Sequence, residues 1–253
     1  MNNSEIVIET KNKENWVYPP SLSKSGRLRS TPEIKEVIEI HSNLVKEPVL
    51  LTSDLHEYAY KAMNEFNELY GLRHYHVICV GDMAGTGRRG SDANPFETYR
   101  LLAQHAKSLY FVQGNHDLPD PLGRELALKN TNGTYCMLRD SLPIETELGK
   151  IVGVNGTISD KPHPYKKPQN QFIRLVEKAL RTRPRIFLTH ETPALPKNER
   201  ERHIGNAELY YLINKYKPEI HIYGHCHHPG TIKIINGVIY INADSRIILL
   251  QPT

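Results

Sequence analysis

Five short polar clusters along the chain contain the side-chain types that bind divalent metal ions. Each cluster follows an apolar run, and together they supply carboxylates, imidazoles and one amide: Asp54 and His56; Asp82; Asn115, His116 and Asp117; His190; His225 and His227. Imidazole nitrogens suit Zn, Fe, Mn and Co, whereas carboxylate and amide oxygens balance charge and can bridge two ions. This combination of residue types predicts a site for a pair of divalent cations.

The spacing inside two of the clusters supports this prediction. On an extended segment, side chains two residues apart point to the same side, so Asp54 and His56 can bind one ion together. His225 and His227 repeat that spacing, and Cys226 between them should point the other way. We therefore interpret Cys226 as a packing residue. A zinc-finger site is disfavoured because no second cysteine lies at finger spacing.

The apolar runs before the clusters indicate the elements that position them. Six runs have the length of buried strands: residues 49–52, 76–80, 109–112, 151–154, 185–189 and 219–223. Three segments with helical periodicity lie among them: residues 58–69, 172–179 and 209–216. The alternation of strands and helices predicts an α/β sheet protein, whose sites gather at the carboxyl ends of the strands.

The beginning of the chain has a different pattern. Thr31 as N-cap and Pro32 at the first helical position predict a helix, which apolar residues at helical spacing continue up to Leu44. We expect residues 1–47 to form an N-terminal extension with this one helix. Residues 48–253 should form the domain that carries the clusters.

Near the end of the chain, three apolar runs are separated by short turns. The runs are residues 230–235, 238–241 and 246–250, and the turns are Asn236-Gly237 and Asp244-Ser245. An Asn-Gly pair between two such runs is a strong signal for a β-hairpin. We therefore expect this part of the chain to form hairpin-connected strands.

Composition and charge limit the classes of protein to which the chain can belong. Hydrophobic residues make up 39% and charged residues 24%, and the net charge of +4 suits an anionic substrate but is too small to predict a nucleic-acid-binding surface. The three cysteines cannot all pair, and no apolar run approaches the roughly 18 residues of a membrane span or resembles a signal peptide. We expect a cytoplasmic protein with reduced thiols and no membrane-spanning segment.

The ordered clusters resemble those of the calcineurin-like metallophosphoesterases. That family carries the blocks D-x-H, G-D, G-N-H-D/E, H and G-H-x-H, and all five occur here in order within residues 48–250. The resemblance implies an α/β four-layer sandwich, in which two mixed β-sheets lie face to face with helices outside. It also implies that residues 48–253 form the metallophosphoesterase domain and that the closing strands within residues 230–250 belong to the second sheet.

The resemblance assigns roles to the clustered residues. It implies one ligand set for each of two metal ions, namely Asp54, His56 and His227 for the first and Asn115, His190 and His225 for the second. Asp82 would bridge both ions. His116 would stay unligated and protonate the leaving group as a general acid, and Asp117 would steady that histidine.

The resemblance also implies a reaction. The family's enzymes are metal-dependent phosphoric ester hydrolases, in which a hydroxide that bridges two metal ions attacks the phosphorus in line. We expect a phosphodiesterase or phosphatase that acts on a phosphate ester of a small molecule or a nucleotide. Mn²⁺ is the first candidate for the two divalent cofactor ions, with Fe or Zn²⁺ as alternatives.

The loop after the second block differs from the protein Ser/Thr phosphatase branch of the family. That branch continues as G-D-x-x-D-R-G, whereas this chain has Gly81-Asp-Met-Ala-Gly-Thr-Gly87, so protein phosphatase activity is disfavoured. Arg88 and Arg89 follow directly and are candidates to bind the substrate phosphate through bidentate guanidinium contacts. A solvated basic loop explains these arginines equally well.

Two other kinds of function stay open. A metal-dependent nuclease would use the same ions, but the sequence shows no clear basic stripe with aromatic platforms. A catalytically weak scaffold or binding module on the same fold would typically lack some ligands, and none is missing here; Trp16 to Pro20 would be the first place to look for its partner. The sequence leaves open both nucleic acid as a substrate and the oligomeric state.

Overall fold

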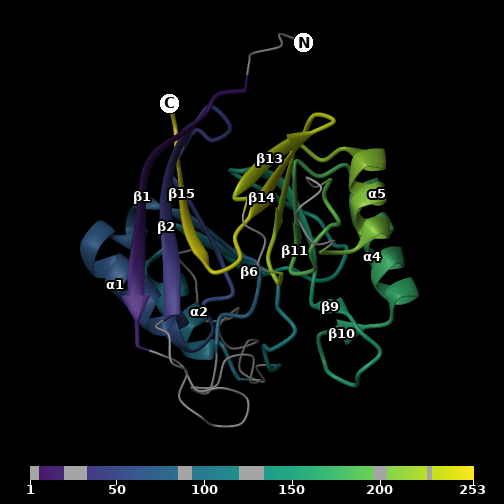
Figure 1. Cartoon of the computed structure of the whole chain (residues 1–253), viewed down its shortest axis with the longest axis horizontal. Coiled ribbons are helices and arrows are strands. Elements are labelled where there is room, and N and C mark those ends of the chain that lie inside the picture. The colour runs from purple at the N-terminus through teal and green to yellow at the C-terminus, as the bar shows by residue number, and fades with distance from the viewer. Residues whose placement is uncertain (1–5, 20–32, 85–92, 120–133, 197–203, 227–229) are drawn as a thin grey trace.

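Two mixed β-sheets face each other in the centre of the molecule (Figure 1). The computed structural model describes residues 6–19, 33–84, 93–119, 134–196, 204–226 and 230–253. In these residues the first sheet has seven strands, in the order β1 (Ile8–Tyr18), β2 (Glu33–Ser42), β15 (Arg246–Gln251), β3 (Val49–Ser53), β4 (His76–Cys79), β5 (Ser108–Phe111) and β6 (Thr134–Met137). The strands from β3 to β6 run parallel, so their carboxyl ends share one edge.

The second sheet has six strands within the described chain. Their order is β13 (Ile232–Ile235), β14 (Val238–Asn242), β12 (Ile220–Tyr223), β11 (Ile186–Thr189), β8 (Gly149–Val154) and β7 (Ile144–Thr146). The four central strands are parallel, and β13 and β7 are antiparallel edge strands. A small parallel pair, β9 (Thr157–Ile158) and β10 (Lys166–Lys167), follows β8.

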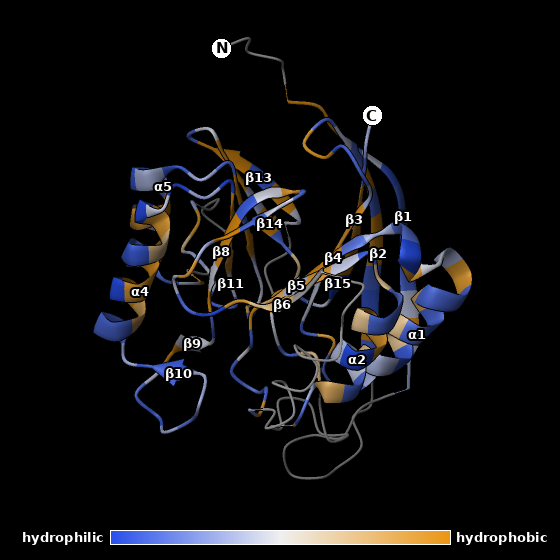
Figure 2. Cartoon of the chain, turned by 180° about the vertical axis from the view of Figure 1, so that it is seen from behind, coloured by the Kyte–Doolittle hydropathy of each residue, from blue (hydrophilic) through white to orange (hydrophobic). Residues whose placement is uncertain are grey.

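Four α-helices in the described part of the chain complete the four layers. α1 (Ala59–Tyr70) and α2 (Phe96–His105) cover the outer face of the first sheet, and α4 (Gln169–Arg181) and α5 (Ala207–Tyr216) cover that of the second (Figures 1 and 2). In Figure 2, β8 and β11 are hydrophobic, whereas α4 alternates between hydrophobic and hydrophilic residues. The sequence-predicted four-layer α/β sandwich is therefore confirmed.

Neighbouring residues of the central strands face different cores because side chains alternate along a strand. In β3, Leu50 packs under the helices of the first sheet, whereas Leu51 lies in the core between the two sheets. In β11, Phe187 faces the helices of the second sheet and Leu188 faces the central core. This burial on both faces explains why the strands appear in the sequence as continuous apolar runs.

The helix predicted from Thr31 to Leu44 is wrong. The described part of this segment forms strand β2, which pairs with β1 on one side and with β15 on the other. Val37 contributes to the helix-covered core, while Ile38 and Ile40 contribute to the core between the sheets. The strand partners come from distant parts of the chain, and this tertiary pairing overrides the local helical spacing. The domain boundary after residue 47 stays a prediction.

The closing strands are divided between the two sheets, which corrects the expectation that all of them belong to the second. The Asn236-Gly237 hairpin is confirmed: both residues have positive φ, 53° and 83°, and join antiparallel β13 and β14. After Asp244-Ser245, however, β15 enters the first sheet between β2 and β3. This crossing ties the two sheets together.

No described helix is long and apolar enough to cross a membrane. All three cysteines are free thiols, and Cys79 is buried within β4.

Candidate metal centre

The predicted ligands come together at the carboxyl ends of parallel strands from both sheets. Asp54 and His56 follow β3, Asp82 follows β4, and Asn115 follows β5, while His190 and His225 follow β11 and β12 of the second sheet: each leaves its strand at the same end. Three other predicted site residues lie outside the described residues, namely His227, Arg88 and Arg89. The ligands that the structure does describe gather at the junction of the two sheets, where His225 is half-buried and the others are buried.

Hydrogen bonds between loops fix the two aspartates. Asp54 Oδ2 accepts hydrogen bonds from Ser53 Oγ at 2.5 Å and from the backbone N–H of His225 at 3.0 Å. Asp82 Oδ1 accepts one from the backbone N–H of His116 at 2.9 Å. Each carboxylate is therefore held by a neighbouring loop while its other oxygen faces the centre.

The backbone at this centre is unusual. Asp54, His56, Asp82 and His225 all have positive φ, between 49° and 74°, a region that few residues other than glycine adopt. Backbone hydrogen bonds hold two of them: the N–H of Asp54 donates to Gly81 O and that of His56 to Asp82 O, both at 3.0 Å. Such strain in non-glycine residues concentrates at functional sites.

Three glycines of the predicted blocks leave room for these contacts. A Cβ atom on Gly81 would lie 2.8 Å from His190 Nδ1, and one on Gly224 would lie 2.5 Å from Asp54 Oδ2. A Cβ on Gly114 would overlap the side chain of Asp82. The loops approach each other so closely that no larger residue fits at these positions.

His190 is oriented as a metal ligand. The side chain is fully buried, and Nδ1 lies 2.6 Å from the carbonyl oxygen of Val80, so Nδ1 carries the proton. Nε2 then faces the carboxylates, 3.2 Å from Asp82 Oδ2 and 3.9 Å from Asp54 Oδ1. Hydrogen bonding of the distal ring nitrogen to a carbonyl is the usual support of a metal-binding histidine.

Several buried polar atoms at the centre lack hydrogen-bond partners. Among the described residues these include His56 Nδ1 and Asn115 Oδ1. In addition, ligand atoms of Asp54, His56 and Asp82 all lie within 4.8 Å of one another. Unpaired buried polar groups are costly, and bound cations would satisfy them. The residues present therefore fit divalent metal ions.

The two aspartates at the centre differ in their pKa. Burial raises the pKa of Asp54 to about 7, and nearby Asp244 and Asp82 add to the shift. Burial also disfavours charge on Asp82, but His190, His56 and His116 outweigh it and hold the pKa of Asp82 below its usual range. A cation between the carboxylates would keep both ionised.

The histidines differ in their protonation. Burial lowers the pKa of His56 and that of His225 to about 4, so both are neutral at pH 7, as metal ligands must be. Burial also acts to lower the pKa of His190, but the carboxylates of Asp82 and Asp54 raise it to about 10. Metal binding would therefore displace a proton from His190.

Asp117 supports the backbone around the centre. Its buried carboxylate accepts hydrogen bonds from the N–H groups of Gly114 at 2.8 Å, Asp82 at 3.0 Å and Met83 at 3.2 Å. His116 itself is half-buried, with its ring 5.8 Å from that of His56 in an edge-to-face arrangement. Asp117 therefore fixes the loops that carry Asp82 and Asn115.

Two residues near the centre escaped the sequence-based prediction. Buried Asp244 acts electrostatically on Asp54 and His225, and it follows β14 as the predicted ligands follow their strands. That position after an apolar run was the available signal. Lys35 on β2 is buried and donates to the carbonyl oxygen of Asp54 at 3.2 Å. No sequence signal marked Lys35, because its segment resembled a helix.

Comparisons with known proteins agree with the fold. The family model described as calcineurin-like phosphoesterase matches residues 47–229. The protein TT1561 of Thermus thermophilus has a similar solved structure, with a TM-score of 0.55, 14% identity and coverage of 79% of this chain and 90% of its own. Another solved structure has a TM-score of 0.54, 15% identity and coverage of 78% and 90%. No curated protein matches the sequence.

Proposed function

The chain belongs to the calcineurin-like phosphoesterase family, and we propose that it hydrolyses a phosphate ester with two divalent cations bound at the junction of its sheets. Metal-dependent hydrolysis of phosphate esters is the chemistry of this family. The single observation that carries the proposal is the convergence of His190 Nε2 and the unpaired atoms His56 Nδ1 and Asn115 Oδ1 around two buried aspartates.

In this proposal the ligands form two sets that share Asp82. In the first set, ligand atoms of Asp54, His56 and Asp82 lie within 4.8 Å of one another, and His227 would complete the set. In the second set, His190 Nε2 lies 3.2 Å from Asp82 Oδ2, and Asn115 and His225 would complete the set, so that Asp82 would be a ligand in both sets. Mn²⁺ is our first candidate for both ions, with Fe or Zn²⁺ as alternatives.

Each group of the site would then have its own role in hydrolysis. The two cations, when bound, clamp the phosphate and lower the pKa of a water molecule. His116 donates a proton to the leaving-group oxygen, and its backbone N–H bond to Asp82 Oδ1 fixes its distance from the centre. Asp117 acts as a positioning residue through its three backbone hydrogen bonds.

The proposed substrate is a phosphomonoester or phosphodiester of a small molecule or a nucleotide. The net charge of +4 favours an anionic ligand without providing the strongly basic surface of a nuclease. Arg88 and Arg89 follow directly in the sequence after the loop that carries Asp82, and we propose them as contacts for the phosphate. No described ligand position carries a non-ligating residue, which favours an enzyme over a scaffold.

Hydrolysis of chromogenic esters tests the proposal. The chain, stripped of metal and reconstituted with Mn²⁺, should hydrolyse bis-p-nitrophenyl phosphate or p-nitrophenyl phosphate, and a chelator should abolish the activity. His116→Ala should lower kcat by about 10²- to 10⁴-fold, the range for loss of a general acid. His105→Ala, at the exposed end of α2, is the matched control and should retain activity. Equal kcat for all three proteins, or no Mn²⁺-dependent turnover, would contradict the proposal.

A further inference from the structure

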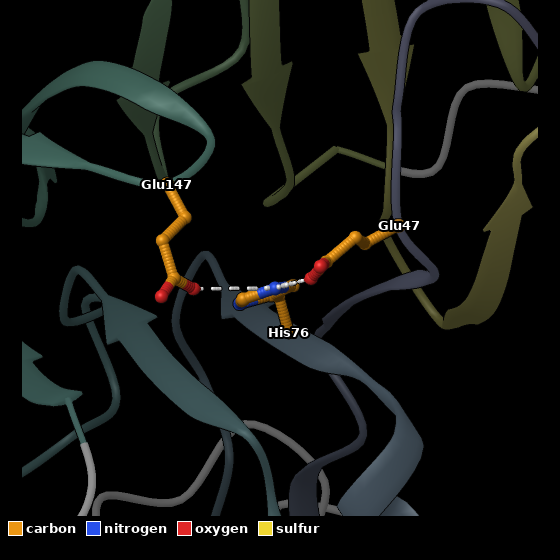
Figure 3. Close-up of side chains that lie close together, drawn as sticks. All are labelled: Glu47, His76 and Glu147. Atoms are coloured by element: carbon orange, nitrogen blue, oxygen red, sulfur yellow. Dashed lines mark hydrogen bonds and ion pairs between the residues drawn. The ribbon is translucent and has the colours of Figure 1, made fainter.

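A second cluster of metal-binding side chains lies at the opposite end of the sheets. It consists of Glu47, His76 and Glu147, called here the His76 cluster, whose ligand atoms lie within 4.8 Å of one another (Figure 3). His76 begins β4, whereas Asp82 follows the end of that strand. With about 3.3 Å per residue, the two clusters are about 20 Å apart. The His76 cluster is therefore separate from the candidate metal centre.

The cluster joins the two sheets. Glu47 precedes β3 and His76 begins β4 in the first sheet, whereas Glu147 lies in the turn between β7 and β8 of the second. Figure 3 shows the imidazole between the two carboxylates, with Nε2 at 2.7 Å from Glu47 Oε2 and 3.5 Å from Glu147 Oε2. Ligands from separate elements converge on one point, as in a structural metal site.

The ring of His76 is held in an orientation that suits metal binding. His76 is fully buried, and its Nδ1 lies 2.7 Å from Ser108 Oγ on the neighbouring strand β5. Metal-binding histidines usually have such a hydrogen bond on the ring nitrogen that does not touch the metal. This bond fixes the plane of the ring and directs Nε2 towards both glutamates.

The distances suit a tetrahedral ion. With bonds of 2.0–2.1 Å to Zn²⁺, neighbouring ligand atoms lie about 3.3 Å apart. The separation of 3.5 Å between Nε2 and Glu147 already fits, and that of 2.7 Å to Glu47 needs to open by about 0.6 Å. Glu47 can make this adjustment because its side chain is 47% exposed.

The cavity at the His76 cluster leaves space for a cation. The three residues line a cavity of about 470 Å³, which leaves room for a water as fourth ligand. Arg185 lines the same cavity, but its guanidinium donates hydrogen bonds to Glu219 Oε1 at 2.9 Å and to the carbonyl oxygen of Leu148 at 2.7 Å. Two exposed ammonium groups lie near the carboxylates, because Lys107 contacts Glu47 and Lys46 lines the same cavity.

We propose that Glu47, His76 and Glu147 bind a Zn²⁺ ion, with water as the fourth ligand, and that this ion fastens the two sheets at the end opposite the candidate metal centre. Zn²⁺ is favoured over Ca²⁺ or Mg²⁺ because an imidazole supplies the buried ligand. The ion would stabilise the sandwich without contacting the substrate.

Zinc content tests the proposal. Glu147→Gln removes one ligand whose side chain is 68% exposed, so the variant should fold. Glu145→Gln on neighbouring β7, with a side chain 75% exposed, is the matched control. After loading with Zn²⁺ and dialysis, the wild type and Glu145→Gln should hold one more equivalent per chain than Glu147→Gln. This difference does not depend on how many ions the candidate metal centre holds.

Thermal unfolding gives a second measurement. In an Asp82→Asn background, which weakens the candidate metal centre, Zn²⁺ should raise the midpoint of unfolding, and Glu147→Gln should remove most of that rise. The phosphate ester hydrolysis of Glu147→Gln alone should match that of the wild type. Equal zinc content and an equal rise in midpoint with and without Glu147→Gln would overturn the proposal and leave His76 as a hydrogen-bonded link between the sheets.

Discussion

Side chains at the candidate metal centre hold neighbouring loops in place by hydrogen bonds to backbone N–H groups. Asp117 shows this most clearly, because its two carboxylate oxygens accept hydrogen bonds from Gly114, Asp82 and Met83. The sequence pattern identified Asp117 as part of the site. It could not show which backbone N–H groups Asp117 binds, because almost every residue has one. Its contribution to positioning emerges only from the folded loops.

Asp117→Asn should damage both stability and activity. The amide keeps one acceptor oxygen and directs an N–H group at a backbone N–H, so a buried hydrogen bond is lost at a cost of about 1–3 kcal/mol. Urea unfolding should show this loss, and kcat for p-nitrophenyl phosphate should fall because Asp82 and Asn115 shift. Asp160→Asn, at an exposed position, serves as the control. Unchanged unfolding and kcat in Asp117→Asn would refute this role.

His221 provides a pH-dependent contribution to stability. Burial lowers its pKa to about 3, and its ring stacks between Phe187 and Tyr223. The unfolded chain has the ordinary histidine pKa of about 6.5, so below that pH it takes up a proton that the folded chain does not. The free energy of unfolding should therefore fall as the pH drops from about 6.5 towards 3, by up to about 1.4 kcal/mol per pH unit.

His221→Phe separates this effect from that of the carboxylates. Urea unfolding at several pH values between 4 and 8, with a chelator present, should show a shallower pH dependence for the variant than for the wild type. Above pH 6.5 the two slopes should agree, because the histidine is neutral in both states. The same slope at acidic pH in both proteins would show that His221 does not control it.

At the scale of elements, strand β2 is the main difference between sequence and structure. Apolar residues at 34, 37, 38 and 44 fit a helix, but β1 and β15 provide hydrogen-bonding partners on both sides of this segment. A local pattern contains no information about partners that lie far along the chain. By contrast, helices α1, α4 and α5 were predicted because each buries a single face, which appears directly as periodicity.

Two isoleucines of β2 test its place in the sheet. Ile38 is buried between the sheets at 3% exposure, whereas Ile34 on the same strand is 50% exposed. Ile38→Ala should lower the free energy of unfolding by about 2–5 kcal/mol through lost burial and a cavity. Ile34→Ala should cost less than about 1 kcal/mol. Denaturant titration measures both values, and equal small losses would place β2 outside the core.

For the whole molecule, the candidate metal centre lies where the two sheets meet. The first sheet provides Asp54 and Asp82, and the second provides His190 and His225. The ordered blocks predicted these ligands because each terminates a strand. The pairing of β15 with the first sheet and the His76 cluster were beyond prediction, since both depend on how the sheets stack.

Metal removal should therefore lower the stability of the whole domain against unfolding. A ligand that binds only the folded state stabilises it by about 2.7 kcal/mol at a concentration 100 times its Kd. A chelator should lower the midpoint of thermal unfolding, and added Mn²⁺ should restore it. In Asp82→Asn the restoration by Mn²⁺ should be much smaller. If Mn²⁺ restored the midpoint equally in both proteins, binding at Asp82 would not be responsible for the stabilisation.

The central claim is that Asp82 lies between two bound cations. Anomalous diffraction from crystals of the Mn²⁺-loaded chain tests it most directly. The account predicts two strong peaks about 3.5–4 Å apart, one beside Asp54 and His56, the other beside Asn115 and His190, with Asp82 in contact with both. A single peak, or peaks that do not contact Asp82, would contradict it.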